Sequence, residues 1–187
     1  MEYQLIRSDR KTMAIQVKDG KVFVRAPLRV SKREIDGFVE KHAEWIEKAL
    51  TRSAEKSKKR QEEVDNAGKI TDAQIRLLAK AAQKTIPERV RYFAPLIGVN
   101  YGRITIRNQS SRWGSCSAKG NLNFNCLLML APPNVLDSVV VHELCHRLEM
   151  NHSPRFYKHV YKYCPDYDEC RKWLKTEGSL LLARRAS

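Results

Sequence analysis

Hydrophobic and polar positions alternate in two short segments near the beginning of the chain, as in strands that bury one face. The segments 13–17 (MAIQV) and 22–26 (VFVRA) flank the sequence KDGK, whose Asp-Gly pair is typical of a tight hairpin turn. Between residues 31 and 50 the period changes, and apolar residues recur every three or four positions. A capping box formed by Ser31 and Glu34 begins this stretch. We therefore expect a β-hairpin followed by an amphipathic helix.

The hydrophobic pattern stops in the polar segment 51–69, which predicts either a linker or a solvated helical extension. We place a domain boundary at the end of this segment. A second helix is expected from Thr71 to Gly98, with one apolar face. Pro87 lies inside it and should kink or split it, because proline lacks the backbone N–H and clashes with the preceding turn.

The rest of the chain alternates between short strands and helices. Residues 109–121 are polar and predict a loop or an irregular edge strand. We expect strands at 101–108 and 122–131, and helices that begin with Asn134 as N-cap, at Pro154 and at Asp168. The pattern as a whole predicts an α+β fold.

The formal net charge of +14 makes anionic partners such as DNA or RNA plausible. The first 69 residues carry 17 basic and 12 acidic side chains, whereas residues 73–136 carry nine basic side chains and one acidic one. The excess charge is thus concentrated in one region. A basic surface that only keeps the protein soluble explains the same distribution equally well.

Cysteine usage and hydropathy predict a cytoplasmic protein without a membrane segment. The five cysteines have no CxxC spacing, which favours reduced thiols over a disulfide framework. No apolar run is long enough to span a bilayer, and the first residues, MEYQLIRSDRK, lack the apolar core of a signal peptide.

The sequence VVVHELCHRLEMNHSPRF, residues 139–156, carries the main candidate chemistry. His142 and His146 lie one helical turn apart, so both imidazoles can reach one metal ion. Glu143 lies about 100° around the helix from His142, beside such an ion, where it can act as general base and then general acid toward a metal-activated water. The apolar neighbours indicate a buried helix, in which unpartnered histidines would cost several kcal/mol. A metal site removes that cost, whereas surface histidines would need an exposed helix.

A catalytic zinc needs a third protein ligand and keeps its fourth position open. His152 follows His142 by ten residues and can return to the ion if the helix ends between Glu149 and Asn151. Glu169, on a later helix, is the rival ligand. We favour His152, because Asn151 can adopt the left-handed conformation that ends helices.

The segments RWGSC (112–116) and VVVHELCH…NHSPRF together resemble the YgjP-like (WLM) metallopeptidases, which are related to the SprT-like proteases. The resemblance also covers much of the first half of the chain. It implies a zincin-like metallopeptidase domain at residues 70–187, preceded at 1–69 by a β-hairpin, a helix and a basic linker. It further implies one Zn²⁺ per chain held by three histidines, which match His142, His146 and His152, with Glu143 catalytic.

The segment SRWGSCS is our candidate for the strand that pairs with an extended peptide or protein substrate, since main-chain hydrogen bonds can bind almost any peptide. Its substrate-binding candidates are Arg112, Trp113, Gly114 and Ser115. In the alternative interpretation, Trp113 anchors the core and the glycine forms a turn.

Three functions fit these residues. The first is a zinc metallopeptidase that hydrolyses peptide bonds and, by resemblance to SprT-like proteases that act on DNA-attached proteins, works near nucleic acid. The second is a nucleic-acid-binding module with a structural zinc, which predicts four protein ligands. The third is a metal-dependent hydrolase of a non-peptide substrate.

Overall fold

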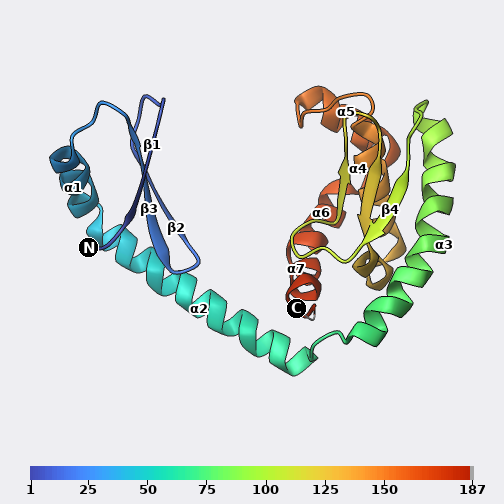
Figure 1. The fold of residues 1–187 in the computed structure, drawn as a ribbon, viewed down its shortest axis with the longest axis horizontal. Helices are drawn as coiled ribbons and strands as arrows, with labels where there is room; N and C mark the ends of the chain where they lie inside the picture. Colours follow the sequence, from blue (N-terminus) through green and yellow to red (C-terminus); the bar gives the residue numbers. More distant parts are fainter. Residues whose placement is uncertain (186–187) are drawn as a thin grey trace. The chain divides into compact units, whose positions relative to one another are not determined.

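The computed structural model describes residues 1–185, and the chain divides into two compact units, Met1–Asn66 and Ala67–Ser187 (Figure 1). The first unit contains a three-stranded sheet and two helices, and the second contains another three-stranded sheet and five α-helices, one of which, α3, begins the unit. Within the part of the chain that the structure describes, no helix is both long enough and apolar enough to cross a membrane.

The expected hairpin lies in the first sheet, whose strand order is β1-β3-β2. Strands β2 (Ala14–Lys18) and β3 (Lys21–Pro27) are antiparallel, and the turn between them places Asp19 and Gly20 at positive φ, 50° and 71°. This is the backbone that an Asp-Gly hairpin turn requires. Strand β1 (Gln4–Ser8) pairs in parallel with β3, so β3 is the central strand and its alternate residues are buried.

The first helix is shorter than the sequence predicts. Helix α1 (Lys32–Lys41) begins with the capping box of Ser31 and Glu34, as expected, but it ends at His42. A second helix, α2 (Ala43–Ala67), follows at once and includes the polar segment, which is therefore a helical extension. One face of α1, the start of α2 and strand β3 form the core of this unit, which contains Val22, Val24, Ala26, Ile35, Val39 and Ile46.

The sheet of the second unit has the order β4-β6-β5, which makes β5 an edge strand. Strand β4 (Ile104–Arg107) is parallel to β6 (Leu122–Asn125), and β5 (Gly114–Cys116) is antiparallel to β6. The polar segment 109–121 thus contains an edge strand and a hairpin turn, in which Gly120 has φ 80°.

The expected strand over 122–131 is only partly correct. Its second half, Cys126–Leu130, is a 3-10 helix (η1). The Asn125 side chain accepts a hydrogen bond from the backbone N–H of Leu127, which ends the strand and starts the helix. The run of residues after Asn125 looks the same in either conformation, because all five residues, Cys126–Leu130, are apolar and show no period.

The remaining helices differ from the expected ones in two places. Asn134 is not the N-cap. The helix starts two residues earlier than expected, at Pro133 with Pro132 as N-cap, and the Asn134 side chain instead donates to Asp166. The last expected helix is broken at Thr176, whose φ and ψ are −97° and −89°. Pro87 does not split its helix. The helices of this unit are α3 (Asp72–Ile97), α4 (Pro133–Cys145), α5 (Pro154–Tyr163), α6 (Tyr167–Lys175) and α7 (Glu177–Ala183).

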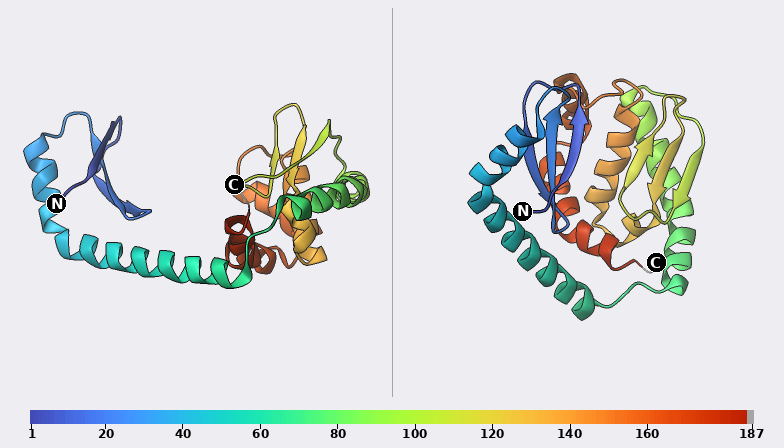
Figure 2. Two further views of the ribbon diagram at one scale, coloured as in Figure 1. Left: turned by 60° about the horizontal axis from the view of Figure 1, so that its bottom comes forward. Right: turned by 60° about the vertical axis from the view of Figure 1, so that its left-hand side comes forward.

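Helix α4 is the centre of the second unit, and Figure 2 shows it from two further sides. It packs against α3, α5, α6 and strand β5. Nine of its 13 residues are buried. This explains why its sequence is apolar on nearly all sides, unlike the one-sided pattern of a surface helix.

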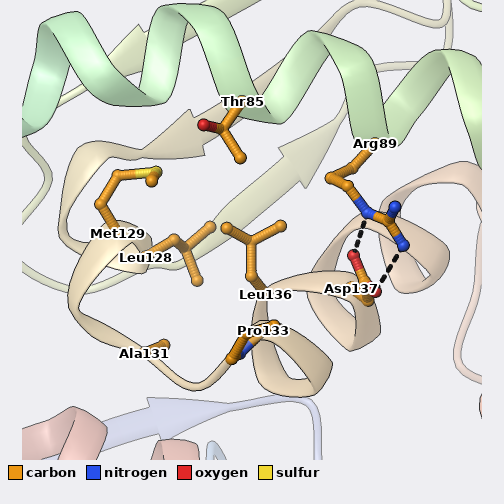
Figure 3. A pocket seen from close by; sticks show the side chains of 8 residues that line it. All are labelled: Thr85, Arg89, Leu128, Met129, Ala131, Pro133, Leu136 and Asp137. Carbon is orange, nitrogen blue, oxygen red and sulfur yellow. Dashed lines mark hydrogen bonds and ion pairs between the residues drawn. The ribbon is translucent and has the colours of Figure 1, made fainter.

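An ion pair fixes α4 to α3 beside a cavity of about 380 Å³ (Figure 3). Arg89 donates from Nε to Oδ1 of Asp137 at 2.6 Å and from Nη2 to Oδ2 at 2.7 Å. Because both bonds are charge-assisted and the pair is only partly exposed, it should contribute more than an isolated surface ion pair.

We expect Asp137→Asn to lower the free energy of unfolding by about 1–2 kcal/mol, since it removes the charge from both hydrogen bonds. Urea unfolding of the full chain measures this. As a control, Glu44→Gln breaks the exposed pair with Lys48 in α2 and should change stability by less than about 0.5 kcal/mol. Equal effects of the two substitutions would contradict a special role for Arg89 and Asp137.

Candidate active site

The end of α4 brings the candidate metal ligands together. His142 lies in the last turn, and His146 is the C-cap residue. The helix therefore ends before the stretch from Glu149 to Asn151, where the sequence predicts its end. Asn151 does not take a positive φ, since Asp19 is the only non-glycine residue with one in the described chain. A turn and a short loop bring His152 back over the helix end, and Ser153 then caps α5.

The three histidines form one group, in which one ring nitrogen of each lies within 4.8 Å of the others. The Nε2 atoms of His142 and His152 are 3.1 Å apart. Two zinc-bound nitrogens at about 2.0–2.1 Å from the ion would be about 3.3 Å apart in a tetrahedral arrangement. The spacing of these imidazoles therefore suits a metal ion of that size.

Hydrogen bonds orient two of the rings. Nδ1 of His146 is 3.1 Å from the carbonyl oxygen of Glu149, which can only accept, so Nδ1 carries the proton and Nε2 is free to bind a metal. Nδ1 of His142 is 2.7 Å from the hydroxyl of Tyr167, the first residue of α6. A donor bond from Nδ1 to this hydroxyl leaves Nε2 of His142 free in the same way.

Burial also favours the neutral imidazoles that metal ions need. Burial, followed by the nearby His146 and His152, lowers the pKa of His142 to about 3. Burial lowers the pKa of His146 as well. At neutral pH both rings therefore have a lone pair available for coordination.

Glu143 lies beside the histidine group and is not part of it. Its side chain is buried, and burial raises its pKa to about 8. A cation nearby acts in the opposite direction, because it favours the carboxylate. A carboxyl group whose pKa is balanced in this way between burial and a cation can exchange protons near neutral pH, as a general base and acid must.

Gly114, at the start of β5, leaves room for this carboxylate. A Cβ atom built on Gly114 would lie 2.6 Å from Oε1 and 2.8 Å from Cγ of Glu143. Any side chain at this position would displace the carboxylate of Glu143. The glycine in RWGSC is therefore explained by the close approach of the edge strand to α4.

A cavity of about 220 Å³ opens next to Glu143 and His142. Three of the four expected substrate-binding residues line it, namely Arg112, Trp113 and Gly114, together with Val139, Tyr167 and Leu174. The fourth, Ser115, is not among its lining residues, and its hydroxyl accepts a hydrogen bond from Asn123. Trp113 also packs on Gly178 of α7 and against the core. It therefore both lines the cavity and anchors the core, the two alternatives that the sequence left open.

Sequence reasoning missed Tyr167, Val139 and Leu174. Tyr167 reaches His142 from a helix that begins 25 positions later, and no local pattern signals that contact. The rival ligand Glu169 is in the first turn of α6 but is absent from the histidine group, as is Cys145.

Comparison with known proteins identifies the class as metal-dependent peptidases. A family model described as "YgjP-like, metallopeptidase domain" matches residues 11–77 and 64–177. The chain therefore belongs to the YgjP-like metallopeptidase family, as its sequence predicts, and it is an enzyme that acts on peptides. The fold is of the expected α+β class. No curated protein matches the chain.

Two solved structures resemble it. The metallopeptidase zymogen jannalysin of Methanocaldococcus jannaschii is 21% identical, with a TM-score of 0.45, over 50% of this chain and 97% of that one. The metallopeptidase zymogen abylysin of Pyrococcus abyssi is 17% identical, with a TM-score of 0.43, over 50% of this chain and 96% of that one.

The contact between Tyr167 and His142 predicts an effect on metal affinity. Tyr167→Phe removes the hydroxyl that orients His142 and should weaken metal binding about 10–100-fold, with activity restored by excess metal. Competition with a chelator measures the affinity. Tyr161→Phe is the matched control, because its hydroxyl contacts Asp168 and not a histidine. Equal affinities in all three proteins would show that Tyr167 does not orient His142.

Proposed function

We propose that this protein is a zinc metallopeptidase in which His142, His146 and His152 hold one Zn²⁺ and Glu143 moves the proton. The convergence of the three imidazoles beside a buried glutamate carries the proposal. Nitrogen donors suit several transition metals, and zinc is the redox-inert member that peptidases with this residue pattern use.

The chain's residues divide the work of hydrolysis. A bound zinc ion would supply Lewis acidity, polarising the peptide carbonyl and lowering the pKa of the attacking water. Glu143 accepts the proton of that water and passes it to the nitrogen of the leaving amine. His142 and His146 are held as neutral metal ligands by Tyr167 and by the carbonyl of Glu149.

Substrate binding is proposed for Arg112, Trp113, Gly114 and Ser115. Strand β5 is at the edge of its sheet, so its outer backbone groups can pair with an extended peptide. The cavity beside Glu143 is lined largely by apolar side chains and can take one side chain of that peptide. Arg112 at its rim is available to an acidic group.

The ligand set argues against a purely structural zinc at the histidines. A structural site normally has four protein ligands. Among the residues that the structure describes, the histidine group has three members, and Cys145, the nearest thiol in sequence, is not one of them. A set of three protein ligands favours catalysis, because a catalytic zinc would keep its fourth position for water or substrate. The family favours peptides over other substrates.

Replacement of Glu143 tests the proposed mechanism. Glu143→Gln should keep the metal but lower the turnover of a peptide mixture, followed by mass spectrometry, by at least about 10²–10⁴-fold, because the amide cannot take up the proton. Glu169→Gln makes the same chemical change on α6 and should leave both metal content and turnover unchanged. A Glu143→Gln enzyme that cleaves as fast as wild type would disprove this role.

We further propose that the protein acts near nucleic acid. Two basic side chains support this, Arg103 and Arg107, which line a groove of about 420 Å³ between α3 and β4. Arg89, from the same basic region, is already paired with Asp137.

The affinity for DNA and RNA should fall as the salt concentration rises. The slope of log K against log salt should become less negative by roughly one for each arginine at positions 103 and 107 that is replaced by glutamine. Fluorescence anisotropy with single- and double-stranded oligonucleotides measures this. If no oligonucleotide binds at low salt, nucleic-acid association is ruled out and the peptidase proposal is unaffected.

A further inference from the structure

A second group of metal-ligating side chains lies where α5 ends and α6 begins. It consists of Cys164, Asp166 and Cys170, whose ligand atoms all lie within 4.8 Å of one another. Sγ of Cys164 is 3.3 Å from Oδ1 of Asp166, and Sγ of Cys170 is 3.6 Å from Oδ2. None of these side chains belongs to the histidine group.

Local structure explains how these side chains meet. Cys164 is the C-cap of α5, Asp166 is the N-cap of α6, and Cys170 lies one turn into α6. Asn134, in the first turn of α4, completes the cluster, because its Nδ2 is 3.0 Å from Oδ2 of Asp166 and 3.6 Å from Sγ of Cys170. The ends of three helices therefore converge on this cluster.

The distances match those between ligand atoms around one zinc ion. With Zn–S of about 2.3 Å and Zn–O of about 2.0–2.2 Å, a tetrahedral ion separates sulfur from oxygen by about 3.5–3.7 Å. The distance of 3.6 Å for Cys170 lies within this range, and the distance of 3.3 Å for Cys164 is slightly shorter. Both sulfurs are buried, whereas Asp166 is only partly buried and provides a route for an ion to enter.

Two thiols that only donate hydrogen bonds to a carboxylate give similar distances. A chemical feature other than distance must therefore distinguish a metal site from a hydrogen-bonded cluster without metal. A pair of thiolates prefers soft or borderline ions, whereas a pair of thiols binds none. Bonds between sulfur and a metal ion therefore form only if the cluster is a metal site and not a hydrogen-bonded cluster. The histidine group contains no sulfur, so the same bonds also tell the two sites apart.

We propose that Cys164, Asp166 and Cys170 form a second metal site that takes Zn²⁺, with the side-chain amide oxygen of Asn134 able to fill the fourth position. A flip of the side-chain amide group exchanges the positions of its oxygen and nitrogen, and it breaks the hydrogen bond from Nδ2 to Asp166. The ion would link α4, α5 and α6. It would also fix Tyr167, which follows Asp166 directly and contacts His142.

Cobalt substitution of the full-length protein tests this site separately from the histidines. The protein is stripped with a chelator under reducing conditions and titrated with Co²⁺, while the near-ultraviolet absorption is recorded. Thiolate ligands give cobalt a strong charge-transfer band, which imidazole ligands do not. We expect wild type to develop this band and to bind one equivalent more than the histidines account for.

Variants assign each equivalent to its site. The double substitution Cys164→Ser and Cys170→Ser should lose the band and one equivalent, whereas His152→Ala should keep the band and lose the other equivalent. Cys126→Ser replaces a buried thiol in η1 and should behave as wild type.

The absence of a charge-transfer band in wild type at saturating Co²⁺ would overturn the second site, whether or not the double variant folds. A band that persists in the double variant would do the same. Neither result bears on the peptidase proposal, which depends on the equivalent lost in His152→Ala.

Discussion

Burial of polar side chains at the end of an apolar helix is the constraint on which the site depends. Glu143 and His146 are almost completely buried, and His142 is half-buried, in a helix whose other residues form the centre of the core. Such groups cost several kcal/mol unless they are partnered. The structure gives His142 and His146 one partner each through Nδ1 and turns their remaining nitrogens toward His152. A metal ion is the partner that would satisfy all three rings at once.

The surrounding fold holds this arrangement in place. Helix α3 is joined to α4 by Arg89 and Asp137, strand β5 covers Glu143 through Gly114, and α6 supplies Tyr167. Each contact comes from a different element, so the position of one catalytic helix depends on most of the second unit. The first unit has its own sheet and its own core, and supplies none of the residues of the histidine group.

Local patterns predicted a large part of this structure. The Asp-Gly turn, the capping box at Ser31 and the pairing of two histidines one turn apart depend on neighbours within a few residues, and the structure contains all of them. The return of His152 was also anticipated, although the helix ends earlier than expected and without a left-handed Asn151.

Features that depend on distant parts of the chain were not predictable in this way. Asn134 is a good N-cap by type, but its side chain is engaged by Asp166, 32 positions away. The apolar run after Asn125 fits a strand or a 3-10 helix equally well, because every residue in it is apolar and no period is visible. The contact between Tyr167 and His142 and the parallel pairing of β1 with β3 were missed for the same reason, since both join elements that are separate in the sequence.

The most direct test of the account is the zinc content of the purified, untagged protein, compared with that of His152→Ala by mass spectrometry. His152 is exposed, so its loss should leave the fold intact, and His159→Ala provides a matched control outside the histidine group. The account predicts that His152→Ala contains one zinc ion per chain less than wild type and His159→Ala contains the same amount. Equal zinc content in all three proteins would show that the histidines at the end of α4 do not hold the metal.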